Sequence, residues 1–346
     1  AGDLLGMVLT HAHEDHMGAV AHLWRKLRCP IWATPFTAWL VRDRLHEYGL
    51  ADEVELHEIA LDSRFDLGPF DIQLVTLTHS IPEPNGLAIR TPAGLVLHTG
   101  DWKIDPDPLI GESTDICALT AMGEEGVLAM VCDSTNVFSK GESGSEAGVK
   151  DELVKVVGEN TTGKVAIAAF ASNVARLQSA IEAAEANGRR VCLVGRSMHR
   201  MTAAAKSVGL LSHVQDFVGE EEAGFFPPEK ILYLCTGSQG EPRAALARIA
   251  AEDHPRIVLN PGDTLIFSSR VIPGNERAIA ELQAKFLRRD IHVITAKDAM
   301  IHVSGHPARD ELTRLYKHLR PEISIPVHGE LRHLTEHAKL ARTCQV

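Results

Sequence analysis

Short apolar runs alternate with amphipathic helical patterns along almost the whole chain, and this alternation restricts the fold more than any other feature. Residues 70–78 and 95–99 have strand patterns, whereas residues 17–28 and 35–48 have helical patterns, the second of which begins at a proline. Strands that alternate with helices are typical of proteins in which helices cover a sheet. The sequence therefore predicts an α/β fold.

The chain is long enough for two domains, because 346 residues exceed the size of one ordinary small domain. Residues 138–148 are rich in Gly, Ser, Lys and Glu, and we expect the chain to cross between domains there. The next stretch repeats strand–helix units at 164–186, 190–209 and 231–250, which predict a second, mostly parallel sheet. Two later strand patterns, at residues 301–306 and 323–328, each end in a histidine.

The composition sets limits on location and partners. No apolar run is long enough to cross a membrane. The six cysteines include no C-x-x-C pair and lie mostly in apolar runs, so reduced thiols and a cytoplasmic protein are expected. The net charge of −11, from 35 Lys+Arg and 46 Asp+Glu, disfavours binding of nucleic acid through an extended basic face. An enzyme that holds a few phosphates through metal ions can nevertheless be acidic overall.

Four candidate metal ligands lie within six residues. His11, His13, Asp15 and His16 follow the apolar strand pattern at 6–10 and precede a helix. Histidines at positions i and i+2 can converge on one metal, while Asp15 and His16, at the helix start, can face a second. Imidazole and carboxylate together suit Zn²⁺, and Mn²⁺ is also compatible. The alternative, a solvated histidine-rich loop, is disfavoured by this order of residues at a strand–helix junction.

Three further candidate ligands each end an apolar strand pattern: His79, Asp101 and His328. Alone, each would more often be a loop residue or a hydrogen-bonded polar group of the core. Ligands gathered at the ends of neighbouring strands are, however, the way in which α/β folds build sites. Together with the residues 11–16, they predict one site with two metal ions.

These motifs resemble the ribonuclease J family, a β-CASP branch of the metallo-β-lactamase superfamily. The hexad His-x-His-x-Asp-His, His79 and the Thr-Gly-Asp turn that ends at Asp101 are similar to the superfamily's metal motifs. Asp133 in Asp-Ser-Thr-Asn, His306 and His328 look like the additional β-CASP motifs. Other runs similar to the family are His-Ser-Ile-Pro at 79–82, Phe-Ala-Ser-Asn-Val at 170–174, Gly-Arg-Ser-Met at 195–198 and Cys-Thr-Gly-Ser-Gln-Gly-Glu-Pro at 235–242.

The resemblance implies a metallo-β-lactamase αββα sandwich into which an α/β β-CASP domain is inserted. The expected domains are residues 1–147 and 301–346 for the metallo-β-lactamase domain and residues 148–300 for the β-CASP domain. Members of the family usually have several strands before the hexad and a further small C-terminal domain. We therefore expect that N-terminal strands of the sandwich and a C-terminal domain are missing from this chain.

The resemblance also implies how the ligands divide between the metals. One ion would be held by His11, His13 and His79 and the other by Asp15, His16 and His328, while Asp101 would bridge the two. Two divalent ions roughly 3.5–4 Å apart share a hydroxide that attacks a phosphodiester in line. The implied activity is metal-dependent hydrolysis of RNA, as a 5′→3′ exonuclease and an endonuclease, in RNA processing and decay.

The leaving 3′ oxygen needs a proton, for which His306 is the candidate acid, with Asp133 as the carboxylate that orients it. The alternative is that His306 only hydrogen-bonds the phosphate. The candidate RNA contacts are Ser172, Asn173, Arg196, Ser197 and Ser304. By resemblance they would help to anchor single-stranded RNA with a 5′-monophosphate, although Ser-Asn and Arg-Ser steps are more often helix caps.

Three other functions stay open. A small-molecule hydrolase is disfavoured by the inserted segment and by Asp133, His306 and His328. A β-CASP DNA nuclease is disfavoured because its last motif lacks the histidine that His328 supplies. An inactive scaffold subunit would have lost ligands, whereas all seven positions are filled here. A homodimer or tetramer is expected for the full-length protein.

Overall fold

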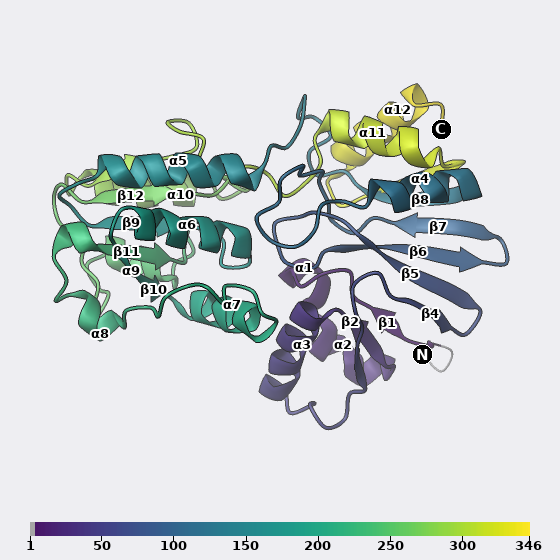
Figure 1. Ribbon diagram of the computed structural model, residues 1–346, viewed down its shortest axis with the longest axis horizontal. Helices are drawn as coiled ribbons and strands as arrows, with labels where there is room; N and C mark the ends of the chain where they lie inside the picture. Colours follow the sequence, from purple (N-terminus) through teal and green to yellow (C-terminus); the bar gives the residue numbers. More distant parts are fainter. Residues whose placement is uncertain (1–3) are drawn as a thin grey trace. The chain divides into compact units, whose positions relative to one another are not determined.

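The computed structural model describes residues 4–346 and divides into two compact units (Figure 1). The first unit consists of Ala1–Gly144 and Ser304–Val346, and the second of Ser145–Val303. None of the helices in the described part of the chain combines the length and apolar character needed to span a bilayer.

The first unit contains two sheets. The smaller one is parallel and has the strand order β1-β2-β3, with β1 at Met7–Val8, β2 at Ile31–Ala33 and β3 at Leu56–Glu58. The larger one is mixed and has the order β14-β8-β7-β6-β5-β4. Its strands in chain order are β4 (Arg64–Leu67), β5 (Phe70–Thr76), β6 (Asn85–Thr91), β7 (Gly94–His98), β8 (Val127–Asp133) and β14 (Ile323–Val327).

Helices cover the outer faces of these two sheets. Val8 of β1 packs against a buried cluster of Ile72, Leu74 and Leu87 on β5 and β6, so the two sheets share a core. The opposite face of the large sheet buries apolar residues of α4 (Ile116–Glu125), α11 (Arg309–Leu319) and α12 (Leu331–Thr343). The helices α2 (Val20–Leu27) and α3 (Pro35–Glu47) lie on the small sheet, where α3 contacts β2 and β3. The predicted αββα sandwich is confirmed.

The second unit is built on a parallel sheet with the strand order β10-β11-β9-β12-β13. Every residue of the three central strands is buried, as expected for a parallel sheet that is covered on both faces. The predicted parallel sheet is therefore confirmed. Its strands are β9 (Val165–Ala168), β10 (Arg190–Val194), β11 (Ile231–Cys235), β12 (Thr264–Phe267) and β13 (His292–Ile294). Its helices are α5 (Glu146–Glu159), α6 (Val174–Ala186), α7 (Arg196–Ser207), α8 (Glu220–Ala223), α9 (Ala245–Ala250) and α10 (Glu276–Leu287), with a 3₁₀ turn, η1, at Pro228–Lys230.

One predicted strand is wrong. The apolar pattern predicts a strand at residues 301–306, but these residues are irregular in the structure. Side chains satisfy their polar groups in place of a neighbouring strand: Arg176 donates to the carbonyl of Ile301, and Asn136 donates to the carbonyl of His306. The local sequence pattern predicts a strand here because it carries no information on these side-chain partners, which lie far away in the sequence.

Candidate metal centre

The residues 11–16 join β1 to the short helix α1 (Glu14–Met17). His13 is the residue before this helix and has an extended backbone, while Asp15 and His16 lie within the four residues of the helix. The side chains of this short segment divide between two groups of candidate ligands, with His11 and His13 in one and Asp15 and His16 in the other. His11 is completely buried, and Asp15 is exposed.

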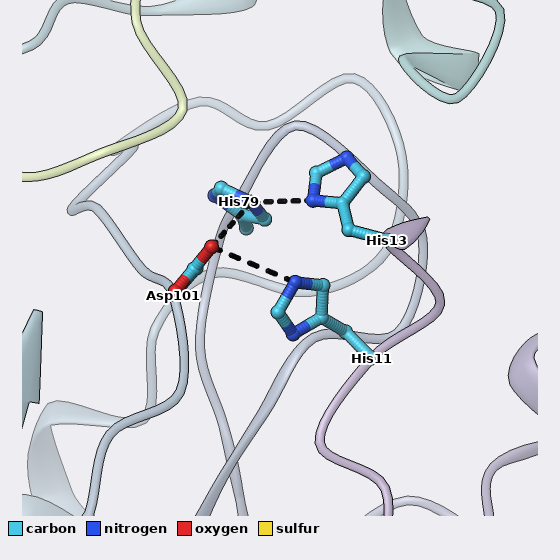
Figure 2. A group of neighbouring side chains, drawn as sticks. All are labelled: His11, His13, His79 and Asp101. Atoms are coloured by element: carbon cyan, nitrogen blue, oxygen red, sulfur yellow. Dashed lines mark hydrogen bonds and ion pairs between the residues drawn. The ribbon is translucent and has the colours of Figure 1, made fainter. Parts of the chain in front are cut away.

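The first group of candidate ligands consists of His11, His13, His79 and Asp101, whose donor atoms all lie within 4.8 Å of one another. Figure 2 shows the three imidazoles and the carboxylate converging. His79 Nε2 lies 2.9 Å from His13 Nδ1 and 3.8 Å from Asp101 Oδ2. His11 Nε2 lies 3.7 Å from the same oxygen. The orientation of the His79 ring is fixed because its Nδ1 donates to the carbonyl of Gly305, which leaves Nε2 facing the other candidate ligands.

The second group consists of Asp15, His16, Asp101 and His328. His328 Nε2 lies 3.1 Å from Asp15 Oδ2 and 3.4 Å from Asp101 Oδ2, and His16 Nε2 lies 3.2 Å from Asp101 Oδ2. His328 follows β14 with a left-handed backbone, at φ 57°, a conformation that is uncommon outside glycine and concentrates at functional sites. The structure thus brings all seven predicted ligand positions together, and Asp101 is common to both groups.

The donor set suits divalent cations. Asp101 is 3% exposed, and its Oδ2 lies within 4.0 Å of nitrogens from His11, His16, His79, His306 and His328. A buried ring nitrogen with no hydrogen-bond partner is costly, and a bound cation would satisfy it. His11 Nε2 is such an atom, because it is buried and has no hydrogen-bond partner within residues 4–346. The cluster is therefore a divalent-metal site in its chemistry.

Burial and charge divide the histidines into two classes. Burial lowers the pKa of His11 and His79 well below the usual value and that of His13 to about 4, so all three are neutral and ready to ligate at neutral pH. Burial would also lower the pKa of His16, but its hydrogen bonds to Asp101 and Asp15 outweigh burial and raise it to about 10. The hydrogen bond to Asp15 raises the pKa of His328 to about 9. In the metal-free protein these two imidazoles carry protons.

Metal binding is therefore expected to release protons. Ligation requires neutral imidazole, so filling the second group at pH 7.5 displaces about two protons per chain, and metal affinity should rise with pH up to the pKa values of His16 and His328. Calorimetric titration with Zn²⁺ in buffers of different ionisation enthalpy measures this release. A binding enthalpy that is the same in every buffer would contradict it.

Asp133 and His306 form a pair beside the second group. His306 Nδ1 donates to Asp133 Oδ2 at 2.8 Å. Burial alone would lower the pKa of His306, but the charge of Asp133 and this hydrogen bond raise it. Asp133 is completely buried at the end of β8. Burial alone would raise the pKa of its carboxyl group, but the charge of His306 and the hydrogen bond to His306 lower that pKa. The geometry is that of an imidazole whose proton and orientation are set by a carboxylate.

The predicted RNA contacts lie in both units. Ser304, in the first unit, accepts from the side chain of Asn136 and from the backbone N–H of His306. Ser172 and Asn173 follow β9, and Arg196 and Ser197 begin α7, all in the second unit. Asn173 is buried. Its side-chain oxygen Oδ1 accepts from the backbone N–H of Arg176 and caps α6, and its side-chain Nδ2 donates to Glu146. The role of these residues in RNA binding stays a prediction.

Sequence reasoning assigned no role to Thr135 and Gly305, which contact the site residues directly. Thr135 Oγ1 lies 2.7 Å from His328 Nδ1. The signal that could have revealed it is its place two residues after Asp133, where a hydroxyl and an N–H commonly bind an aspartate side chain.

Three family models match the chain. The beta-lactamase superfamily domain matches residues 2–122, the ribonuclease J beta-CASP domain matches residues 162–285, and the Zn-dependent metallo-hydrolase RNA specificity domain matches residues 290–344. A solved structure of a protein of unknown function from Enterococcus faecalis has a similar fold, with a TM-score of 0.62 and 16% identity over 93% of this chain and 75% of that one.

Curated relatives extend the similarity across both units. Ribonuclease J of Sinorhizobium meliloti is 47% identical over 98% of this chain and 60% of its own length. Ribonuclease J of Corynebacterium glutamicum is 44% identical over 97% of this chain and 46% of its own length, and that of Mycolicibacterium smegmatis is 41% identical over 99% and 62%. The chain thus spans between about half and three fifths of the length of these relatives. With its αββα sandwich, its inserted parallel sheet and these matches, the chain belongs to the ribonuclease J family, in the β-CASP branch of the metallo-β-lactamase superfamily.

Proposed function

We propose that the protein is a metal-dependent ribonuclease that hydrolyses RNA phosphodiester bonds, as a 5′→3′ exonuclease and as an endonuclease, in RNA processing and decay. The observation that carries the proposal is the convergence of seven donor side chains beside the Asp133–His306 pair. The relatives named ribonuclease J and the match to an RNA specificity domain support RNA as the substrate.

The seven side chains would hold two divalent ions, with Zn²⁺ preferred and Mn²⁺ as the alternative. When bound, such ions lower the pKa of a water and neutralise charge on a phosphate. The chain itself contributes the remaining steps. The Nδ1 proton of His306 is held by Asp133. The proton on Nε2 of the same ring is therefore the one that His306 can donate to the leaving 3′ oxygen. Asp133 stabilises the protonated ring and keeps its orientation.

The site argues against one of the three other functions. An inactive scaffold subunit is disfavoured because all seven donor positions converge in one place. A small-molecule hydrolase and a β-CASP DNA nuclease share the metal chemistry, so only substrate comparison separates them from a ribonuclease.

The six cysteines are free thiols, which supports a cytoplasmic location. We also propose the boundaries 1–147, 148–300 and 301–346 for the domains, and a homodimer or tetramer for the full-length protein.

Reconstitution with metal tests the proposal. Metal-free protein is titrated with Zn²⁺ or Mn²⁺ while the cleavage of a single-stranded RNA and of the matching DNA is followed. Cleavage of RNA is expected to rise with the second equivalent of metal. A protein that cannot hold two equivalents would support the scaffold alternative, and equal cleavage of DNA would support the DNA nuclease.

The chemistry of the RNA 5′ end gives a further prediction. If Ser172, Arg196, Ser197 and Ser304 help to anchor a 5′-monophosphate, exonucleolytic cleavage of 5′-phosphorylated RNA should exceed that of 5′-hydroxyl RNA by about tenfold or more, since one charge-assisted hydrogen bond contributes roughly 1.5–3 kcal/mol. Arg196→Ala should reduce this ratio, while the equally exposed His199→Ala serves as the control. Equal rates on the two RNAs would remove the phosphate-anchoring role.

A further inference from the structure

The turn at residues 133–136 links the candidate acid to a candidate metal ligand. Thr135 Oγ1 lies 2.6 Å from Asp133 Oδ1 and 2.7 Å from His328 Nδ1, and the backbone N–H of Thr135 also donates to Asp133 Oδ1 at 2.8 Å. The other oxygen of Asp133 accepts from His306 Nδ1. One buried carboxylate is therefore connected to two histidines, directly to His306 and through a hydroxyl to His328.

The number of protons fixes the direction of these hydrogen bonds. A carboxylate only accepts, so the single hydroxyl proton of Thr135 lies in the short contact with Asp133. Thr135 Oγ1 must then accept from His328, which places a proton on Nδ1 of that ring. In the neutral ring that ligates a metal, the lone pair of His328 is consequently on Nε2, the nitrogen that faces Asp15 and Asp101.

A second chain of hydrogen bonds holds this turn from behind. The side chain of Ser134 contacts Nδ1 of His337 at 2.8 Å, and both residues are completely buried. The other nitrogen of His337 contacts Tyr316 at 2.9 Å, and Tyr316 contacts Ser324 on β14 at 2.6 Å. The turn is thereby fixed to α12, α11 and the strand that carries His328.

We propose that Thr135 is a positioning residue that transmits the fixed orientation of Asp133 to His328 and selects its Nε2 as the atom that faces the second group of ligands. The inference rests on the proposed metal-dependent function, to which Thr135 would contribute without being one of the seven candidate ligands. Groups that bind the far nitrogen of a ligating histidine set its tautomer and ring orientation, and their loss lowers metal affinity by about 10–100-fold.

Two substitutions at Thr135 and one matched control separate this role from a structural one. Thr135→Val removes the hydroxyl and keeps the shape, whereas Thr135→Ser keeps the hydroxyl. The control Thr120→Val removes a hydroxyl that makes a similar 3.0 Å contact with Nδ1 of His318 and binds none of the candidate ligands. Both threonines are half-buried.

Metal affinity for each equivalent of Zn²⁺ is measured by calorimetry, and RNA cleavage is measured in parallel. Thr135→Val is expected to bind the first ion as the wild type does and the second about 10–100-fold more weakly. Thr135→Ser and Thr120→Val should bind both ions as the wild type does. Wild-type affinity for the second ion in Thr135→Val, or a loss in Thr135→Ser equal to that in Thr135→Val, overturns the proposal.

A measurement on the wild-type protein decides the question even if Thr135→Val does not fold. In the Zn²⁺-loaded protein, ¹⁵N NMR should show a proton on His328 Nδ1 and none on Nε2. A proton on Nε2 and none on Nδ1 overturns the proposed role of Thr135. If the wild type and Thr135→Val both bind two ions with the same affinity, only the proposed role of Thr135 is wrong. If the wild type holds no metal pair, the proposed function fails with it.

Discussion

Replacing His306 by alanine is expected to leave both metal groups able to bind and to lower RNA turnover by about 10²–10⁴-fold, the range typical of a lost general acid. We expect the metals to stay because His306 belongs to neither of the two groups described above, although it is part of a third set of neighbouring donors with Asp101, Asp133 and His328. Although His306 lies near Asp101 and His328, its Nδ1 already donates to Asp133 Oδ2. Metal content and steady-state cleavage rates, measured on the same preparation, check both parts of this prediction.

The exposed His46 on α3 supplies a control, since His46→Ala removes an imidazole far from the candidate ligands in the chain and should change neither quantity. Cleavage at the wild-type rate by His306→Ala would exclude the acid role. Loss of one equivalent of metal would instead make His306 a ligand.

A modified substrate distinguishes the two roles that His306 can have. In an RNA whose scissile 3′ oxygen is replaced by sulfur, the leaving thiolate needs no proton. If His306 is the acid, His306→Ala should cleave this RNA nearly as fast as the wild type does. If His306 only hydrogen-bonds the phosphate, the defect of the variant should be the same on both RNAs.

The sequence predicted which donor side chains come together, because local rules place most of them. His79 and Asp101 follow buried strands, and strand ends in an α/β sheet meet at one edge. The residues 11–16 lie at a strand–helix junction, where a short segment can point donors at two positions. These rules require only the order of residues along the chain.

Other features depend on contacts between distant segments and could not be predicted in this way. The irregular segment 301–306 is held by Asn136 and Arg176, which lie far from it in the sequence. The link between Thr135 and His328 spans 193 residues, and His328 has a left-handed backbone. Asn173 matches a family motif, yet its capping of α6 and its bond to Glu146 are visible only in three dimensions.

Replacing Asp101 by asparagine is expected to have a larger effect than replacing any other single ligand. Asp101 is the one residue common to both ligand groups, and its Oδ2 lies within 4.0 Å of five histidine nitrogens. The amide has the same shape but no charge, so both groups lose the carboxylate that offsets the charge of their cations. We expect affinity for both equivalents of Zn²⁺ to fall and RNA cleavage to drop by about 10³-fold or more.

Asp15→Asn is the matched control, because Asp15 belongs to the second group alone. This variant should keep one equivalent of Zn²⁺ at wild-type affinity and lose the other, whereas Asp101→Asn should weaken both. Calorimetry combined with metal analysis of the dialysed proteins measures the difference. If Asp101→Asn weakens only one equivalent, Asp101 does not bridge two ions, and the two groups must be treated as independent sites that lie next to each other.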